Sequence, residues 1–281
     1  MKKESFADVA HNVQSEPRDL ALKVAYLGAP FAGFARQPCQ VTVQGQLEAA
    51  LKTLLRREVE TICAGRTDSG VHALGQVISC ALNPSPAEQS LDLFAFRRSL
   101  EVLAGTGISV RAAAFVPAGF SARFDAVERV YRYRIFVGNE EPLFCAPFAW
   151  HITHALNVDA MRAAATYLVG EHDFTSFCVT VSAAKLRDQG LSLARNVHAI
   201  ELFEEDVLGE NCITIEVRGN AFLHSMVRTL VGTLVEVGLG NRAPEWVVSV
   251  LEARQRSAAG QTAPAAGLTF VNVRYPAPLF D

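Results

Sequence analysis

The sequence is organised around the stretch Ala64-Gly65-Arg66-Thr67-Asp68-Ser69-Gly70-Val71-His72-Ala73. Two glycines bracket a short polar loop, which lets the backbone turn sharply and approach another group closely. The loop presents an arginine, a carboxylate, hydroxyls and a histidine between two segments with strand character. Asp68 and Thr67 could also simply hydrogen-bond the backbone of a turn, because Asp-Ser-Gly is common turn chemistry. The spacing alone leaves a turn and a functional site both open.

Segments with strand and helix patterns follow one another in an irregular order on both sides of this loop. Thr42 is expected to cap the first helix, because threonine accepts well from the first turn. Hydrophobic periodicity predicts, in the first half, strands at 20–26, 58–63, 76–81 and 108–115 and a helix at 91–103. It also predicts a helix that starts after Thr42, carries apolar residues from 43 to 55 on one face and has Arg56 and Arg57 at its C-terminal end. In the second half it predicts strands at 129–137, 196–203, 212–218 and 268–274 and helices at 158–169 and 221–237. Residues 181–193 and 255–266 are rich in Ala, Ser, Gly and Gln and are expected to be mobile loops.

This irregular order indicates an α+β fold rather than a doubly wound parallel sheet. We expect a disordered N-terminal tail at 1–18 and an N-terminal α+β half at 19–118 that carries the quoted loop. A C-terminal α+β half then occupies 119–281.

The composition excludes several classes of protein. Of the 281 residues, 50% are hydrophobic, enough to bury a core. The net charge of −3 excludes a protein that coats nucleic acid by bulk charge, but not a local basic cleft. No apolar run is long enough to cross a membrane, the first 17 residues lack the apolar region of a secretory signal, and the six cysteines form no C-x-x-C pair. We therefore expect a cytoplasmic protein with mostly reduced, buried cysteines.

Three other interpretations of the motifs fail on missing partners. Asp-Ser-Gly-Val-His is superficially similar to a subtilisin-like aspartate segment, but the required histidine and serine segments do not occur. A phosphate loop at 28–33 would need a Gly-Lys-Ser/Thr ending, which is absent. His172 and Asp173 are adjacent and lack further spaced ligands, so they make a poor metal site.

Five sequence segments, taken together and in their order along the chain, indicate a family resemblance. They are the quoted loop, Tyr26-Leu27-Gly28 through Phe31-Ala32-Gly33-Phe34, Arg129-Val130-Tyr131-Arg132-Tyr133, Gly170-Glu171-His172-Asp173-Phe174-Thr175-Ser176-Phe177, and Asn220-Ala221-Phe222-Leu223-His224-Ser225-Met226-Val227-Arg228. Together they resemble the tRNA pseudouridine synthase A family over about residues 20–276. Two departures are visible: Ser69 stands where alanine is common, and Phe34 stands where tryptophan is common. Neither position carries a reactive group.

The resemblance implies two ferredoxin-like halves that share a continuous antiparallel sheet, with the active-site cleft between them. It implies isomerisation of uridine to pseudouridine at positions 38, 39 and 40 of the tRNA anticodon stem-loop, without a cofactor or metal. It also implies a homodimer that grips tRNA. Asp68 takes the role of the catalytic carboxylate, as a nucleophile at C1′ or C6 or as a base at C2′; the sequence does not choose between these.

The resemblance also assigns partners to Asp68. Arg228 is expected to form an ion pair with it that keeps the carboxylate ionised and oriented. At about 100° per residue, Arg228 falls at the edge of an apolar helix face, which also suits an arginine that snorkels at the surface. Tyr131 is expected to stack on the target base, on the strand face opposite Arg132 and Arg134. Leu268 is expected to pack against the same base.

Basic residues supply the expected RNA contacts. Arg66 is expected to bind the phosphate of the flipped nucleotide or to brace the loop. The segment 123–134 is locally positive, so Arg123 and Arg129 are expected to help line an RNA cleft. His72 and His172 are expected to brace loops, and Glu171 and Asp173 to cap or brace the segment around them.

Two alternative functions come from other classes. One is a catalytically idle RNA-binding module of the same fold, and the other is a nucleoside hydrolase that releases free base. The joint presence of Asp68, Arg228 and Tyr131 argues against an idle module.

Overall fold

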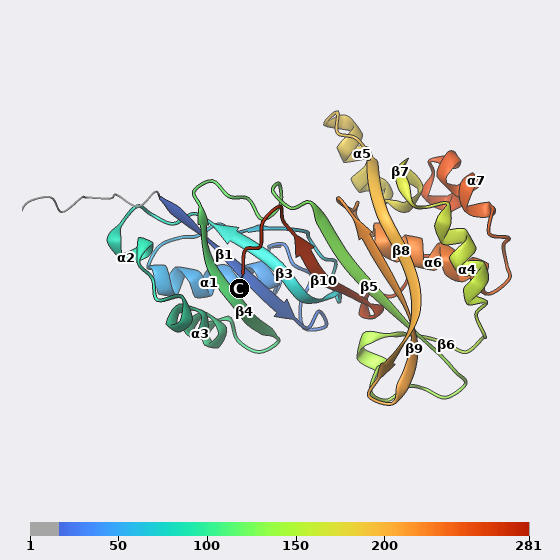
Figure 1. Cartoon of the computed structure of the whole chain (residues 1–281), viewed down its shortest axis with the longest axis horizontal. Coiled ribbons are helices and arrows are strands. Elements are labelled where there is room, and N and C mark those ends of the chain that lie inside the picture. Colours follow the sequence, from blue (N-terminus) through green and yellow to red (C-terminus); the bar gives the residue numbers. More distant parts are fainter. Residues whose placement is uncertain (1–16, 281) are drawn as a thin grey trace, which may run out of the picture.

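The computed structural model describes residues 17–280 and contains one large sheet flanked by helices (Figure 1). Its strand order is β4-β1-β3-β10-β5-β9-β8-β7, with β2 paired to β3 and β6 paired to β5. The N-terminal half contains β1 (Arg18–Tyr26), α1 (Val43–Leu55), β2 (Ile62–Cys63), β3 (His72–Cys80), α2 (Pro86–Gln89), α3 (Leu93–Ala104) and β4 (Ile108–Pro117). The C-terminal half contains β5 (Glu128–Val137), β6 (Trp150–Ile152), α4 (Val158–Thr166), β7 (Gly170–Asp173), α5 (Thr180–Asp188), β8 (Ala194–Val207), β9 (Glu210–Gly219), α6 (Met226–Gly238), α7 (Trp246–Ala253) and β10 (Leu268–Arg274).

Both halves follow the same topology. Strands β1, β2, β3 and β4 alternate with α1 and α3 and lie in the order β4-β1-β3-β2. Strands β5, β8, β9 and β10 alternate with α4 and α6 and lie in the order β10-β5-β9-β8. This is the β-α-β-β-α-β arrangement of a ferredoxin-like unit. The predicted α+β class and the pair of ferredoxin-like halves are confirmed.

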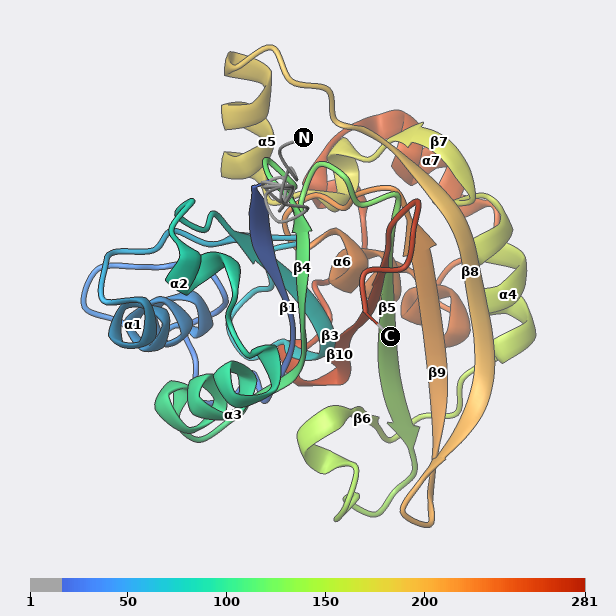
Figure 2. The ribbon, with the colours of Figure 1, turned by 60° about the vertical axis from the view of Figure 1, so that its left-hand side comes forward.

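The seam between the halves is made by β10, which lies between β3 and β5 (Figure 2). It pairs antiparallel with β5, where Phe270 lies opposite Tyr131, and parallel with β3, where Thr269 lies opposite His72. The sheet is therefore continuous and mostly antiparallel, as expected, with parallel pairing only at this seam and at the short β5–β6 pair among the described strands. The register places the start of β10 beside the end of the quoted loop.

One hydrophobic core extends through both halves. Its fully buried members include Leu22 of β1, Tyr133 of β5 and Phe270 of β10. Helix α6 is buried over 11 of its 13 residues, so it forms the centre of the C-terminal half rather than a surface helix. A rigid core on both sides of the seam fixes the position of side chains from the two halves relative to one another.

Several elements differ from the sequence prediction. Strand β2 covers only Ile62–Cys63, because the Glu48 carboxylate accepts from the Thr61 N–H at 2.8 Å and replaces a strand partner there. Residues 181–193 were expected to be a mobile loop, but α5 occupies most of that range. Helix α6 starts five residues later than predicted, at Met226. Strand β1 starts at Arg18, inside the expected tail, and residues 1–16 of that tail lie outside the described residues.

The structure also shows the state of the cysteines and the length of the helices. All six cysteines are free, and four of them are buried, while Cys39 is exposed and Cys63 is half-buried. Between residues 17 and 280, no helix combines the length and the apolar composition needed to span a bilayer.

Candidate active site

The quoted loop connects β2 to β3 and is held from several sides. The Gln76 amide donates to the Gly65 carbonyl at 2.6 Å, and the hydroxyls of Tyr26 and Thr67 are 2.8 Å apart. Gly28 is needed because a Cβ there would lie 2.4 Å from the backbone of Gly70. The glycines of the 28–33 segment therefore serve close packing against this loop.

Asp68 lies at the N-terminal end of α6, where its carboxylate receives two hydrogen bonds on one oxygen. Arg228 Nη1 donates to Asp68 Oδ2 at 3.0 Å, and Ser225 Oγ donates to the same oxygen at 2.7 Å. The guanidinium is itself fixed, since Arg228 Nε donates to the Ala263 carbonyl at 2.7 Å. The expected ion pair is thus present in the structure, and it joins a loop of one half to a helix of the other.

The sequence analysis missed two residues of this site, His224 and Ser225. His224 Nε2 lies 3.5 Å from Asp68 Oδ1, and its Nδ1 is 2.7 Å from the hydroxyl of Ser182 on α5. The only available signal was their place just before Arg228, in a segment predicted to be ordinary helix. The structure shows instead that this segment is the loop that leads into α6.

Tyr131 is enclosed by aromatic edges beside the loop. The residue is 6% exposed, and its ring meets Phe222 and Phe270 edge-on, with centroid distances of 5.2 and 4.8 Å. Burial raises the pKa of Tyr131 well above its usual value, and the charge of Asp68 acts in the same direction. The phenol therefore remains protonated at neutral pH. Leu268, 5% exposed, opens β10 opposite Tyr133 in the neighbouring register position.

Arg66 and Arg123 form a positive rim near the loop. Both side chains are exposed, and both act on the half-buried Cys63. Burial raises the pKa of the Cys63 thiol to about 11, and the two guanidinium groups lower it in part. Within residues 17–280, Arg66 forms no ion pair, so its charge is available to a ligand.

Arg129 does not belong to this rim, which corrects the expectation that it contacts RNA. Its side chain is buried, with 7% of the residue exposed. It donates to the carbonyls of Ala64, Ala126, Asn220 and Arg123. Because its donors are used by backbone carbonyls, Arg129 ties the start of the loop at Ala64 to the segments around Arg123 and Asn220.

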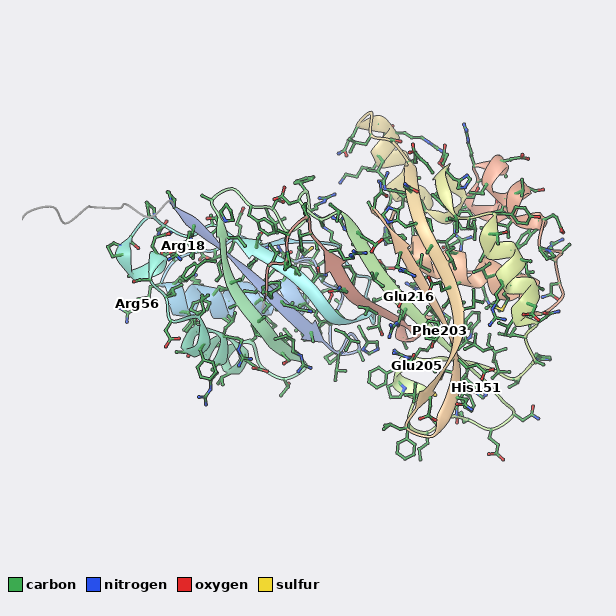
Figure 3. All side chains as sticks on the ribbon, in the orientation of Figure 1. Arg18, Arg56, His151, Phe203, Glu205 and Glu216 are labelled. Atoms are coloured by element: carbon green, nitrogen blue, oxygen red, sulfur yellow. The ribbon has the colours of Figure 1, made fainter. Side chains whose placement is uncertain are left out.

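Arg132 and Arg134 point to the other face of the sheet, as the alternation of β5 predicts. Arg132 pairs with Glu216 at 2.7 Å and Arg134 with Glu205 at 2.8 Å. Figure 3 shows Glu205, Glu216 and Phe203 along β8 and β9. These arginines are neutralised, so the basic surface expected over 123–134 reduces to Arg123.

The predicted bracing groups are found for three of four residues. His72 Nδ1 accepts from the Gly28 N–H at 3.1 Å, and its Nε2 lies 3.1 Å from the Pro147 carbonyl. His172 contacts the Val169 carbonyl at 3.0 Å, and Asp173 accepts from the Thr175 N–H at 2.9 Å. Glu171 is exposed on β7 and forms no such contact with the part of the chain that the structure describes.

A family model described as tRNA pseudouridine synthase matches residues 164–276, which include Arg228 and Leu268. The fold and the site thus define a pseudouridine synthase. The chain is 40% identical to tRNA pseudouridine synthase A of Halalkalibacterium halodurans, with 89% of each chain covered. It is 38% identical to that of Francisella tularensis subsp. novicida (92% of this chain, 95% of the relative) and 41% identical to that of Brevibacillus brevis (90% and 97%). The chain belongs to the tRNA pseudouridine synthase A family.

Proposed function

We propose that this protein isomerises uridine to pseudouridine in tRNA, with Asp68 as the catalytic carboxylate. The observation that carries the proposal is the 3.0 Å contact between Asp68 and Arg228, which brings an ionised acid from one half against a cation from the other. A charge-assisted hydrogen bond of this kind is strong and holds the carboxylate in one orientation. A catalytically idle RNA-binding module would not require a carboxylate held in this way.

The reaction breaks the bond between N1 of uracil and C1′ of the ribose and forms a bond between C5 and C1′. The base must turn without leaving, the C5 proton is lost, and N1 gains a proton, so the product is an isomer of the substrate. Asp68 assists either as a nucleophile at C1′ or C6 or as a base that removes the C2′ proton. Both routes need a deprotonated oxygen facing the nucleotide. Asp68 Oδ1 is that oxygen, because Oδ2 already accepts two hydrogen bonds.

Tyr131 and Leu268 are proposed to receive the flipped base. The Tyr131 hydroxyl lies against Gly65 of the loop, and Leu268 precedes Thr269, which pairs with His72 at the end of the loop. Base flipping needs an apolar surface that offsets the lost stacking. Arg66 and Arg123 are proposed to contact the RNA backbone. Such contacts position the RNA and make its binding sensitive to salt.

We propose the uridines at positions 38, 39 and 40 of the anticodon stem-loop as targets, as the family resemblance implies. These positions share no sequence context, so recognition rests on the shape of the tRNA. We also propose a cytoplasmic location, where tRNA is modified, and a homodimer.

The dimer contact is proposed on the sheet face opposite α6. A cavity of about 600 Å³ opens there between the two halves and is lined by Arg134 and Glu205 among other residues. Three exposed leucines border it, Leu27, Leu74 and Leu208, which are 49%, 51% and 75% exposed. An apolar patch of this kind is typical of an interaction surface, and a second copy of the chain would cover it.

A tritium-release assay on tRNA labelled at C5 of uridine tests the function. The wild-type protein should release tritium while the RNA chain and the base count stay intact. Asp68→Asn should release none and still bind tRNA, because it keeps the shape of the side chain and loses the charge. Asp159→Asn, the same change at an exposed carboxylate on α4, serves as the matched control and should retain full activity.

Other outcomes would contradict the proposal. A nucleoside hydrolase would yield free uracil, and a pure RNA-binding module would bind tRNA and release no tritium. Normal turnover by Asp68→Asn would show that the catalytic group lies elsewhere.

A further inference from the structure

Ser225 stands at the N-terminal boundary of α6 but does not cap the helix. Serine at this position usually accepts a hydrogen bond from the first turn of the helix. Four other helices are capped by a side chain in this way, at Thr42, Ser85, Asp92 and Asn157. Ser225 makes no such bond, and its hydroxyl donates to Asp68 Oδ2 at 2.7 Å instead. The side chain has been turned away from the helix toward the carboxylate.

The backbone of Ser225 is strained in a way that produces this orientation. Its φ of 56° and ψ of 14° lie in the left-handed region, which residues with a Cβ adopt rarely. A cap residue normally has extended backbone angles, as Thr42 and Asn157 do. The Thr229 N–H still donates to the Ser225 carbonyl at 3.0 Å, so the helix itself begins normally. Strain of this kind persists at sites where the surrounding structure requires it.

The hydroxyl completes the fixation of the carboxylate. A single bond from Arg228 would leave the Asp68 side chain free to rotate about its terminal torsion, which is soft. Two donors that converge on Oδ2 from residues one turn apart remove that freedom. Asp68 Oδ1 accepts no hydrogen bond from residues 17–280, and His224 Nε2 lies 3.5 Å from it, beyond a good hydrogen bond.

We infer that Ser225 is a positioning residue, which together with Arg228 holds Asp68 Oδ2 so that Oδ1 faces the nucleotide. The inference rests on the proposed role of Asp68. Ser225 acts through the carboxylate and does not itself touch the substrate. Its loss should therefore lower the rate of the chemical step and leave tRNA binding unchanged.

Two variants separate this role from a purely structural one. Ser225→Gly removes the hydroxyl and at the same time suits the left-handed backbone, so its Tm should equal or exceed that of the wild type. Its kcat for tritium release should fall by roughly tenfold, the usual worth of a hydrogen bond to a charged group. Its KM for tRNA should stay within about twofold of the wild-type value if only the chemical step is affected.

A second variant, Ser225→Asn, should be more active than Ser225→Gly. Asparagine tolerates the left-handed region and carries an N–H donor that can reach the carboxylate. Its kcat should return to within a few-fold of the wild type, with KM unchanged.

Three results would overturn the inference. They are a wild-type kcat for Ser225→Gly, a raised KM with unchanged kcat, or a Ser225→Asn variant that stays as slow as Ser225→Gly. Failure of the proposed function looks different, because then Asp68→Asn would remain active. If Asp68→Asn is inactive and Ser225→Gly is fully active, the proposed role of Asp68 stands and only the role of Ser225 is refuted.

Discussion

Gly232, on the buried side of α6, provides a test of how the helix and the active site are coupled. A Cβ at this position would lie 1.8 Å from the carbonyl oxygen of Gln261, about 1.6 Å short of ordinary contact at 3.4 Å. The obstruction is backbone, which cannot rotate away as a side chain could. The same segment supplies the Ala263 carbonyl that accepts from Arg228. We therefore predict that Gly232→Ala affects both stability and catalysis.

The sign of the stability change depends on two opposing effects. Alanine is preferred to glycine inside a helix by about 1 kcal/mol. Overpacking that forces the backbone to shift costs about 3 kcal/mol, at the upper end of the usual range. The net change is a loss of about 2 kcal/mol, which corresponds to a fall in Tm of about 5 °C for a chain of this size. Activity should also fall, because the displaced Ala263 carbonyl no longer fixes Arg228.

Thermal unfolding and tritium release, measured on the same preparations, check this prediction. Gly45→Ala in α1 is the matched control, because the nearest atom to its Cβ is the Thr42 hydroxyl at 3.0 Å, the end of a side chain. Its stability should change by less than about 1 kcal/mol, with full activity. If Gly232→Ala instead unfolds at or above the wild-type temperature, the packing argument for this helix is refuted.

Two further predictions concern His72 and the exposed leucines. Burial lowers the pKa of His72 below its ordinary value of 6.5, so the folded protein keeps the ring neutral where the unfolded chain binds a proton. The free energy of unfolding should therefore fall as the pH drops below 6.5. Between about pH 7.5 and 5.5, the Tm of His72→Asn should fall by less than the Tm of the wild type. Equal falls in Tm would show that His72 is not the source of the pH dependence. Leu74→Glu combined with Leu208→Asn should convert the proposed dimer to the 30.4 kDa monomer in light scattering, since Asn suits the positive φ of 56° at Leu208. An unchanged mass would exclude this face as the contact.

Local patterns were enough to predict most of the helices and strands. Helix α1 begins at Val43, directly after its predicted threonine cap, and ends at Leu55, just before the predicted Arg56 and Arg57. Strand β10, Leu268–Arg274, matches its predicted range. Elements held by distant partners were missed or misjudged. Helix α5 buries only Ala183, so its sequence lacks the apolar stripe that would reveal a helix. The parallel partner that extends β3 back to His72 comes from the far end of the chain and leaves no local trace.

The same distinction applies to the site. Asp68, Arg228 and Tyr131 were predicted as site residues through the family resemblance, and the structure shows that Asp68 and Arg228 are in contact. Arg129 was misjudged because a run of arginines gives no information on which guanidinium groups are used by carbonyl oxygens. Ser225 could not be found from the pattern, because the turn that aims its hydroxyl is set by the packing of the whole cleft.

The placement of β10 has a consequence for how the molecule is made. Strand β10 follows every other strand of residues 17–280, yet it lies at the centre of the sheet between β3 and β5. During synthesis on the ribosome, β3 and β5 emerge before β10. Until β10 is made, the edge of each strand that will pair with β10 has no partner. Until β10 is synthesised, these open edges are exposed to unwanted pairing, and a chain that lacks β10 cannot join the two halves of the sheet through it.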